Sequence, residues 1–219
     1  MLQVHANGLE FHCLTKGSGP KVLLLHGFPD TAHTWQHQMD ALAHAGFCAI
    51  APYLRGYHPA IVAAHLLDPK HVQRSFHWWF FQQADFPEKA LLADDMAFID
   101  YLWREWCAPG YEDREHIQSV KDCLRQAGVL QATLGYYRAM FDPAKADPAL
   151  AALRNQMARP ITVPTLALCG AQDLRAELMR QQDAYFTGGY TYLEVLGAGH
   201  FLHREQPAAV NQLLLDWLR

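Results

Sequence analysis

The chain has 219 residues, of which 51% are hydrophobic and 18% charged, a composition typical of a soluble globular protein. Its formal net charge of −4 argues against a nucleic-acid-binding protein, which usually carries a basic patch, and gives no attraction to anionic membranes. The five cysteines are scattered, as is typical of reduced thiols, and neither a signal peptide nor a membrane-length apolar run is present. We therefore expect a cytoplasmic protein without nucleic-acid or membrane partners.

The N-terminal segment predicts four short strands and one helix. Leu2–His5 and Leu9–Thr15 flank an Asn-Gly dipeptide, the signal of a tight hairpin turn. Val22–His26 is almost continuously apolar, which predicts a strand buried on both faces of a parallel sheet. A helix with apolar residues at helical spacing is expected over Thr34–Ala45, and a further buried strand over Phe47–Ala51.

From residue 58 to about residue 160 the sequence becomes rich in aromatic and charged residues with helical periodicity. Phe98, Leu102 and Trp106, for example, fall on one face of a predicted helix. The tryptophans expected on the inner face of this helical unit are Trp78, Trp79, Trp103 and Trp106.

Short apolar runs typical of strands return after Pro160. Strands are predicted over Thr165–Cys169 and Tyr190–Leu196, and a terminal helix over Pro207–Leu218. The predicted architecture is an α/β core split into residues 1–57 and 161–219, with a helical lid inserted as residues 58–160.

Motifs at the ends of these strands occur in a characteristic order. His26-Gly27-Phe28-Pro29 follows the third strand, and Arg55-Gly56-Tyr57 and His58-Pro59 precede the lid. Asp173 follows the strand at 165–169, and Gly197-Ala198-Gly199-His200-Phe201 follows the next one. In this order and spacing the chain resembles the epoxide hydrolase and haloalkane or haloacid dehalogenase branch of the α/β-hydrolase fold superfamily.

The resemblance implies roles for four of these residues. Main-chain N–H groups at Gly27 and Phe28 would stabilise developing negative charge as an oxyanion hole. His200 would be the general base, since histidine titrates near neutrality, and Asp173 would orient it. The alternatives are a turn-capping aspartate and a structural loop histidine. Asp30 is expected to be a helix N-cap rather than a catalytic carboxylate.

The resemblance also implies substrate-binding residues in the lid. Epoxide hydrolases of this branch carry a lid tyrosine that protonates the ring oxygen, and His77 occupies the corresponding place here. The His77-Trp78 pair looks more like fluoroacetate-type dehalogenases, where N–H groups hold the departing halide. Tyr136 and Tyr137 resemble a second lid tyrosine site. The alternative for all four is an aromatic lid core; the implied ligand is a small apolar organic molecule, without metal or cofactor.

The nucleophile that the resemblance calls for has no match. It should stand on a Gly-x-Ser-x-Gly or Gly-x-Asp-x-Gly turn, in a stretch of roughly 60 residues between Arg-Gly-Tyr and His-Pro. Here Tyr57 is joined directly to His58, and the serines, Ser18, Ser75 and Ser119, lie outside any such turn. The nucleophile elbow is therefore missing from the chain.

Three functional hypotheses follow from this combination. The first is an α/β hydrolase left impaired or inactive by the lost nucleophile. The second is a non-catalytic protein that binds a small ligand in the aromatic pocket of the lid. The third is a weak hydrolase in which Asp173 and His200 activate water directly on a substrate held at Phe28.

Loss of the central strands should leave two open sheet edges. These edges belong to the predicted strands Val22–His26 and Thr165–Cys169, and an open edge invites pairing. We expect the two strands to pair with each other and close a six-stranded sheet of order 1-2-4-3-7-8 in the numbering implied by the resemblance. The alternative is a homodimer formed through the exposed edges.

Overall fold

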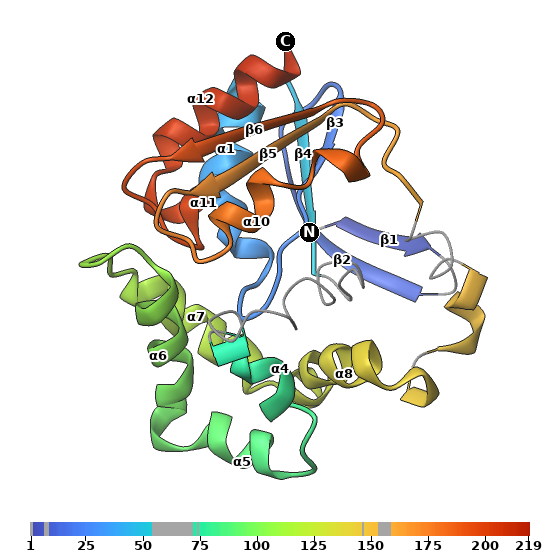
Figure 1. Ribbon diagram of the computed structural model, residues 1–219, viewed down its shortest axis with the longest axis vertical. Coiled ribbons are helices and arrows are strands. Elements are labelled where there is room, and N and C mark those ends of the chain that lie inside the picture. The colour runs from blue at the N-terminus through green and yellow to red at the C-terminus, as the bar shows by residue number, and fades with distance from the viewer. Residues whose placement is uncertain (1, 7–8, 54–71, 74, 146, 153–158) are drawn as a thin grey trace.

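The computed structural model describes residues 2–6, 9–53, 72–73, 75–145, 147–152 and 159–219. Two sheets and the first and last long helices form one part of the molecule, and a group of helices forms the other (Figure 1). The predicted Arg55-Gly56-Tyr57 and His58-Pro59 motifs and the Tyr57–His58 junction lie outside the described residues. The predicted domain boundary at that junction remains a prediction.

The N-terminal sheet has four strands in the order β1-β2-β4-β3. The hairpin of β1 (Leu2–Ala6) and β2 (Leu9–Lys16) is confirmed, and β2 pairs antiparallel with β4 (Cys48–Pro52). The short β3 (Lys21–Leu23) pairs parallel with β4. A 3₁₀ turn, η1 (Ala32–Trp35), leads into α1 (Gln36–His44), whose apolar face forms a small core with β3 and β4.

The C-terminal half forms a second, two-stranded parallel sheet of β5 (Thr165–Gly170) and β6 (Tyr190–Val195). Between these strands lie α10 (Ala176–Arg180) and the 3₁₀ turn η5 (Asp183–Tyr185). The chain ends in α11 (Leu202–Glu205) and α12 (Pro207–Leu218), and α12 packs against α1. This helix pair joins the two sheets.

The predicted closure of the sheet is wrong in the part of the chain that the structure describes. β3 and β5 belong to different sheets and share no ladder. The physical reason is that other contacts set the position of β5: α12 packs on α1, and the loop after β6 is hydrogen-bonded to the lid. These contacts hold the second sheet in place without help from the edge of β3.

The prediction of a strand buried on both faces at Val22–His26 is also wrong. Leu24 is 7% exposed and packs beside α1, whereas Leu23 is 60% and Leu25 52% exposed. Because side chains alternate between the faces of a strand, one face is covered and the other is bare. Although the strand is almost continuously apolar, no described residues bury the side chains on its second face.

The helical unit predicted from aromatic periodicity is present as α4 to α8. Its helices are α4 (Phe76–Phe80), α5 (Phe86–Leu92), α6 (Ala97–Trp106), α7 (Arg114–Leu124) and α8 (Val129–Phe141), with 3₁₀ turns at Asp94–Met96 (η2), Pro143–Lys145 (η3) and Pro148–Leu150 (η4). No helix in the described ranges combines the length and the apolar character that crossing a membrane requires.

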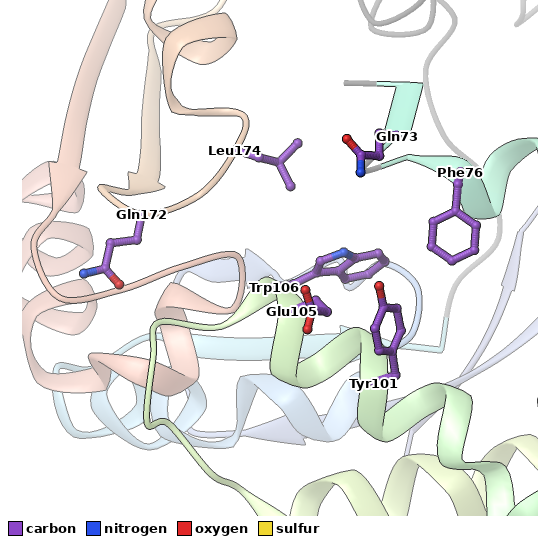
Figure 2. Close-up of a pocket in the computed structure, with 7 residues that line it drawn as sticks. All are labelled: Gln73, Phe76, Tyr101, Glu105, Trp106, Gln172 and Leu174. Carbon is purple, nitrogen blue, oxygen red and sulfur yellow. The ribbon is translucent and has the colours of Figure 1, made fainter. Parts of the chain in front are cut away.

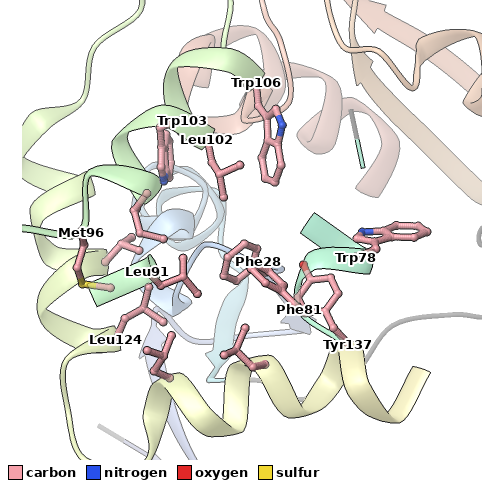
Figure 3. Close-up of a cluster of buried hydrophobic side chains, with 14 of the residues drawn as sticks. Phe28, Trp78, Phe81, Leu91, Met96, Leu102, Trp103, Trp106, Leu124 and Tyr137 are labelled. Atoms are coloured by element: carbon pink, nitrogen blue, oxygen red, sulfur yellow. The ribbon is translucent and has the colours of Figure 1, made fainter. Parts of the chain in front are cut away.

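The lid helices surround a large aromatic and aliphatic core (Figure 3). Trp78, Trp103 and Trp106 are buried in or beside this core, as predicted, but Trp79 is 39% exposed, so its predicted inward orientation is wrong. Phe28 and Phe201 reach into the core from the α/β part of the chain. The lid therefore shares its core with the loops that carry the predicted site.

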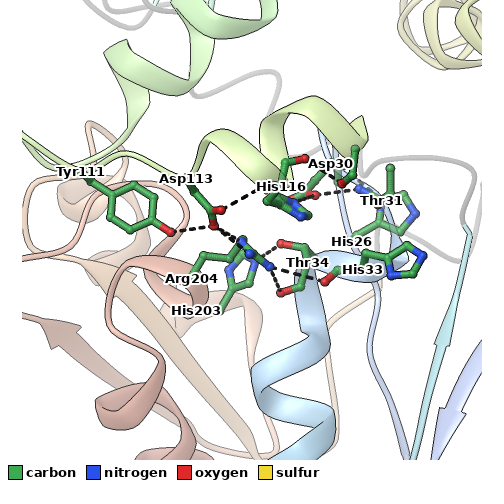
Figure 4. A network of polar contacts seen from close by, with 12 residues as sticks. His26, Asp30, Thr31, His33, Thr34, Tyr111, Asp113, His116, His203 and Arg204 are labelled. Atoms are coloured by element: carbon green, nitrogen blue, oxygen red, sulfur yellow. Dashed lines mark hydrogen bonds and ion pairs between the residues drawn. The ribbon is translucent and has the colours of Figure 1, made fainter. Parts of the chain in front are cut away.

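A network of polar side chains links the lid to the α/β part (Figure 4). The Asp30 carboxylate lies 2.8 Å from His116 Nε2 of α7, and both side chains are buried. The Arg204 guanidinium of α11 pairs with Asp113, whose carboxylate also accepts the His116 main-chain N–H and so caps α7. The expectation that Asp30 caps a helix is wrong, because Thr31 occupies the N-cap position of η1 and Asp30 is used to bind the lid.

Candidate active site

The predicted acid and histidine meet at the ends of β5 and β6. Asp173 Oδ2 lies 2.8 Å from His200 Nδ1, and the side chains are 5% and 28% exposed, respectively. Burial of Asp173 opposes its ionisation, but the hydrogen bond from His200 and the positive charge of Arg175 hold the pKa of its carboxyl below the usual range. An ionised aspartate on Nδ1 holds the ring proton on that nitrogen, so Nε2 carries the lone pair, which is the tautomer a general base needs.

Arg175, two residues after the aspartate, lies against the same histidine. Its Nη1 is 2.9 Å from His200 Nδ1 and 3.3 Å from Nε2, while its main-chain N–H donates to Asp173 Oδ1 at 2.9 Å. No motif in the sequence singles out Arg175, because a residue at the start of a short helix is ordinarily exposed. Its position beside the two ring nitrogens results from the turn between β5 and α10.

The histidine loop is held by the buried carboxylate of Glu205. Glu205 Oε2 accepts the main-chain N–H groups of Gly199 at 2.9 Å and Ala108 at 2.6 Å, and Oε1 accepts that of Phe201 at 2.9 Å. The N–H of His200 itself donates to the Trp106 carbonyl at 2.7 Å. One carboxylate and one carbonyl therefore join the end of α6 to both flanks of the histidine.

A series of aromatic contacts leads from the dyad to the predicted oxyanion loop. The ring of His200 is 5.5 Å from that of Trp106, which is 5.0 Å from His77, and His77 lies 6.2 Å from Phe28. Tyr137 packs edge-on against Phe28 at 5.5 Å. The structure thus brings Phe28, His77 and Tyr137 together, with Trp106 between them and the dyad.

The remaining predicted residues lie around this series. Trp78 is buried, with its ring 6.2 Å from that of His77, and Tyr136 is half-buried on α8. Gly27 is half-buried and accepts the main-chain N–H of Asp30 at 2.8 Å. The oxyanion role of Gly27 and Phe28 and the substrate contacts of the lid residues remain predictions.

His77 is a buried, neutral imidazole. It is 1% exposed, and burial together with the positive charges of Arg175 and His200 lowers its pKa well below the usual value. Its Nδ1 has no hydrogen-bond partner among the described residues. A buried ring nitrogen without a partner is energetically unfavourable, which makes it available to a ligand atom.

A cavity of about 340 Å³ opens between the lid and the turn that carries Asp173 (Figure 2). Its wall is a mixture of aromatic, aliphatic and polar side chains: Gln73, Phe76, Tyr101, Glu105, Trp106, Gln172 and Leu174. Gln172 and Leu174 flank Asp173 in sequence, and Trp106 contacts His200, so the cavity adjoins the dyad. In the described part of the chain no group of three or more His, Cys, Asp or Glu side chains could hold a metal ion.

Comparison with known proteins agrees with this fold. No protein-family model matches the chain. The AB hydrolase superfamily protein YfhM of Bacillus subtilis is 25% identical over 288 aligned positions, which cover 99% of this chain and 96% of the relative. That alignment is about 70 positions longer than the 219-residue chain, so the relative has residues that this chain lacks.

Two further matches add a short region of higher sequence identity and a similarity in three-dimensional structure. An epoxide hydrolase of Caballeronia sordidicola is 54% identical over 54 residues, 25% of this chain and 16% of that protein. Among solved structures, Cfl2 from Burkholderia cenocepacia is similar with a TM-score of 0.79 and 19% identity, covering 99% of this chain and 95% of that one. A structural likeness at this identity establishes the fold.

Proposed function

This chain has the α/β-hydrolase fold and is related to α/β hydrolases that include epoxide hydrolases, and from that premise we propose that it is a hydrolase relative without its nucleophile. It retains the acid at Asp173, the histidine at His200 and the oxyanion positions Gly27 and Phe28. As it stands, it binds small apolar organic molecules and catalyses little or no covalent hydrolysis.

The observation that carries this proposal is an intact dyad without a nucleophile turn in the sequence. Asp173 and His200 are 2.8 Å apart, yet nowhere in the chain do two glycines stand four positions apart, as a Gly-x-Ser-x-Gly or Gly-x-Asp-x-Gly turn requires. Residues of a catalytic triad act as a unit, so losing the nucleophile removes most of the rate enhancement.

The exposure of His200 supports a second candidate function. Its side chain is 28% exposed, so solvent reaches the ring, whereas Asp173 is 5% exposed and orients it. In this alternative the dyad activates a water molecule directly on a bound substrate, without a covalent intermediate. Such a protein would be a weak hydrolase rather than a binding protein.

Steady-state assays on epoxides, haloacids and p-nitrophenyl esters separate the two candidates. We expect turnover at or near the uncatalysed rate for the parent chain and for His200→Ala alike. Substantial turnover that His200→Ala abolishes would contradict the proposal and establish the water-activation route. The cytoplasmic location inferred from composition is tested separately by cell fractionation.

Restoring the missing segment tests whether the chain is an α/β hydrolase that lacks only its nucleophile. We would insert, between Tyr57 and His58, the elbow-bearing segment of an active epoxide hydrolase from the same branch. Epoxide turnover should appear, and it should disappear when the inserted nucleophile is changed to alanine or when His200 is. An inserted chain that folds but stays inactive would show that the dyad is not a retained catalytic pair.

A further inference from the structure

The Arg175 guanidinium has donors that the described residues do not use. Its Nη1 contacts the two ring nitrogens of His200, and within the described ranges it forms no ion pair with a carboxylate and no other side-chain hydrogen bond. A guanidinium carries five N–H donors. Most of the hydrogen-bonding capacity of this half-buried cation is therefore available to a ligand.

Two other arginines, Arg138, which is half-buried, and Arg204, which is buried, show how a guanidinium is paired elsewhere in this chain. Arg138 binds the Glu88 carboxylate through both terminal nitrogens, at 2.8 and 3.1 Å, and Arg204 binds Asp113 at 2.7 Å. Asp173, two residues before Arg175, has one oxygen bound to His200 and the other to the Arg175 main-chain N–H. It is therefore not available to satisfy the guanidinium in the same way.

The surroundings of Arg175 suit an acid with an apolar body. The cavity beside the dyad is walled in part by Phe76, Trp106 and Leu174, the residue next to Arg175. Glu105 is the acidic side chain on that wall, and its carboxylate lies 3.8 Å from Arg104. Nδ1 of His77 is a second polar group without a partner among the described residues, and it is close enough to Arg175 for the two to interact electrostatically.

We propose that Arg175 binds the carboxylate of a small organic acid whose apolar part occupies the adjoining cavity. Planar guanidinium and carboxylate groups form two parallel charge-assisted hydrogen bonds, and such pairs are among the strongest in proteins. The proposal rests on the ligand-binding role of this site and names its ligand class.

Binding of phenylacetate and of its neutral analogue phenylacetamide, measured by titration calorimetry at low salt, tests the proposal. Phenylacetate should bind at least about tenfold more tightly, a difference of about 1.4 kcal/mol, and its affinity should fall as salt is added because an exposed charge pair is screened. Equal affinities for the two compounds, or no phenylacetate binding at about 10 mM, would overturn the proposal.

Arginine variants test whether Arg175 is the group that binds the carboxylate. Arg175→Gln should weaken phenylacetate binding at least about tenfold and leave phenylacetamide unaffected, while Arg175→Lys keeps the charge but loses the planar fork and should fall between. Arg180→Gln is the matched control, because Arg180 lies on the same helix and pairs with Glu194 at the surface. Equal losses of phenylacetate affinity in Arg175→Gln and Arg180→Gln would mean that net charge governs binding. That result would refute the proposed site at Arg175.

The imidazole signals of His200 in NMR spectra provide a readout that does not depend on turnover. Phenylacetate should shift them in the parent chain and in Arg180→Gln but not in Arg175→Gln, whose folding is checked by circular dichroism. Binding without any shift at His200 would place the acid elsewhere and overturn the assignment. Efficient epoxide turnover by the parent chain would instead contradict the proposed function and leave the carboxylate site intact.

Discussion

Glu205 stabilises the loop of His200 from inside the protein. Its carboxylate accepts three main-chain N–H groups, those of Ala108, Gly199 and Phe201. Glu205→Gln would place an amide NH₂ against at least one of these donors, so one N–H would lose its acceptor. We expect the free energy of unfolding to fall by about 2–3 kcal/mol in urea titrations, because hydrogen bonds to buried charged groups are of that size.

Glu112→Gln is the control for that change. Glu112 is exposed and pairs with Arg114 at the surface, so its loss should alter stability by no more than about 0.5 kcal/mol. A Glu205→Gln variant as stable as Glu112→Gln would show that the loop does not depend on the carboxylate.

Gly199 is required by the close approach of two backbones. A Cβ atom at this position would lie 2.4 Å from the Trp106 carbonyl oxygen and 2.7 Å from the Cys107 carbonyl carbon. Gly199→Ala should therefore push the lid away from the histidine loop and lower the unfolding midpoint. Gly135→Ala on α8 meets nothing within 4 Å and should instead gain about 0.5–1 kcal/mol from helix propensity. Equal effects of the two substitutions on urea unfolding would contradict this packing.

At the residue scale, the sequence predicted the pair that motifs can mark and missed the residues that depend on tertiary placement. Asp173 and His200 follow strands in a recognisable order, and they lie 2.8 Å apart in the structure. Arg175 carries no local signal, since a charged residue near a short helix is usually solvated, and the place of Glu205 after the histidine motif does not show which main-chain groups it binds. Their contacts arise only when the turn after β5, the loop after β6 and the end of α6 meet.

At the level of elements, the histidines between lid and α/β part make stability depend on pH. Burial lowers the pKa of His203 to about 3 and that of His77 well below its usual value, so both are neutral when folded. The unfolded chain binds protons at these histidines below about pH 6.5, so acid favours unfolding. We expect the free energy of unfolding to fall from about pH 7 downward, with a limiting slope of about 1.4 kcal/mol per pH unit for each histidine.

Carboxyl groups act in a lower pH range. Despite their burial, the hydrogen bond from His116 keeps the pKa of Asp30 below the usual value, and that from Arg204 does so for Asp113. Their contribution is complete above about pH 4 and is lost as the pH falls through the lowered values. Urea titrations at pH 7, 6 and 5 therefore report on the histidines, and a constant unfolding free energy across that range would contradict the prediction.

Element types were predicted better than their environments. The hairpin, the helix at α1 and the lid helices follow from turn residues and from apolar periodicity, which are local properties. The exposure of Leu23 and Leu25 was not predicted. An apolar run indicates that burial of the strand would be favourable, but it does not show whether other parts of the chain pack against it. The separation of β3 from β5 was missed for the same reason.

For the whole molecule, we propose the homodimer that the sequence offered as the alternative to sheet closure, because one face of β3 is exposed. We expect sedimentation velocity to show a concentration-dependent dimer, because an open strand edge with Leu23 and Leu25 exposed favours pairing with a second copy. Leu25→Lys should shift the protein toward monomer, whereas Leu92→Lys on the lid, where the side chain is also half-exposed, should not. A parent chain that is monomeric at all concentrations would contradict the proposal.

The largest hydrophobic core lies among the helices α4 to α8 and not beside the two sheets. Among the described residues the largest core lies within the lid, where Phe28 and Phe201 enter it, while the cores beside β3–β4 and β5–β6 are small and separate. Burial of apolar surface provides most of the free energy of folding. We therefore expect the helices α4 to α8 to contribute most of the stability, so that on heating the two sheets unfold before these helices do.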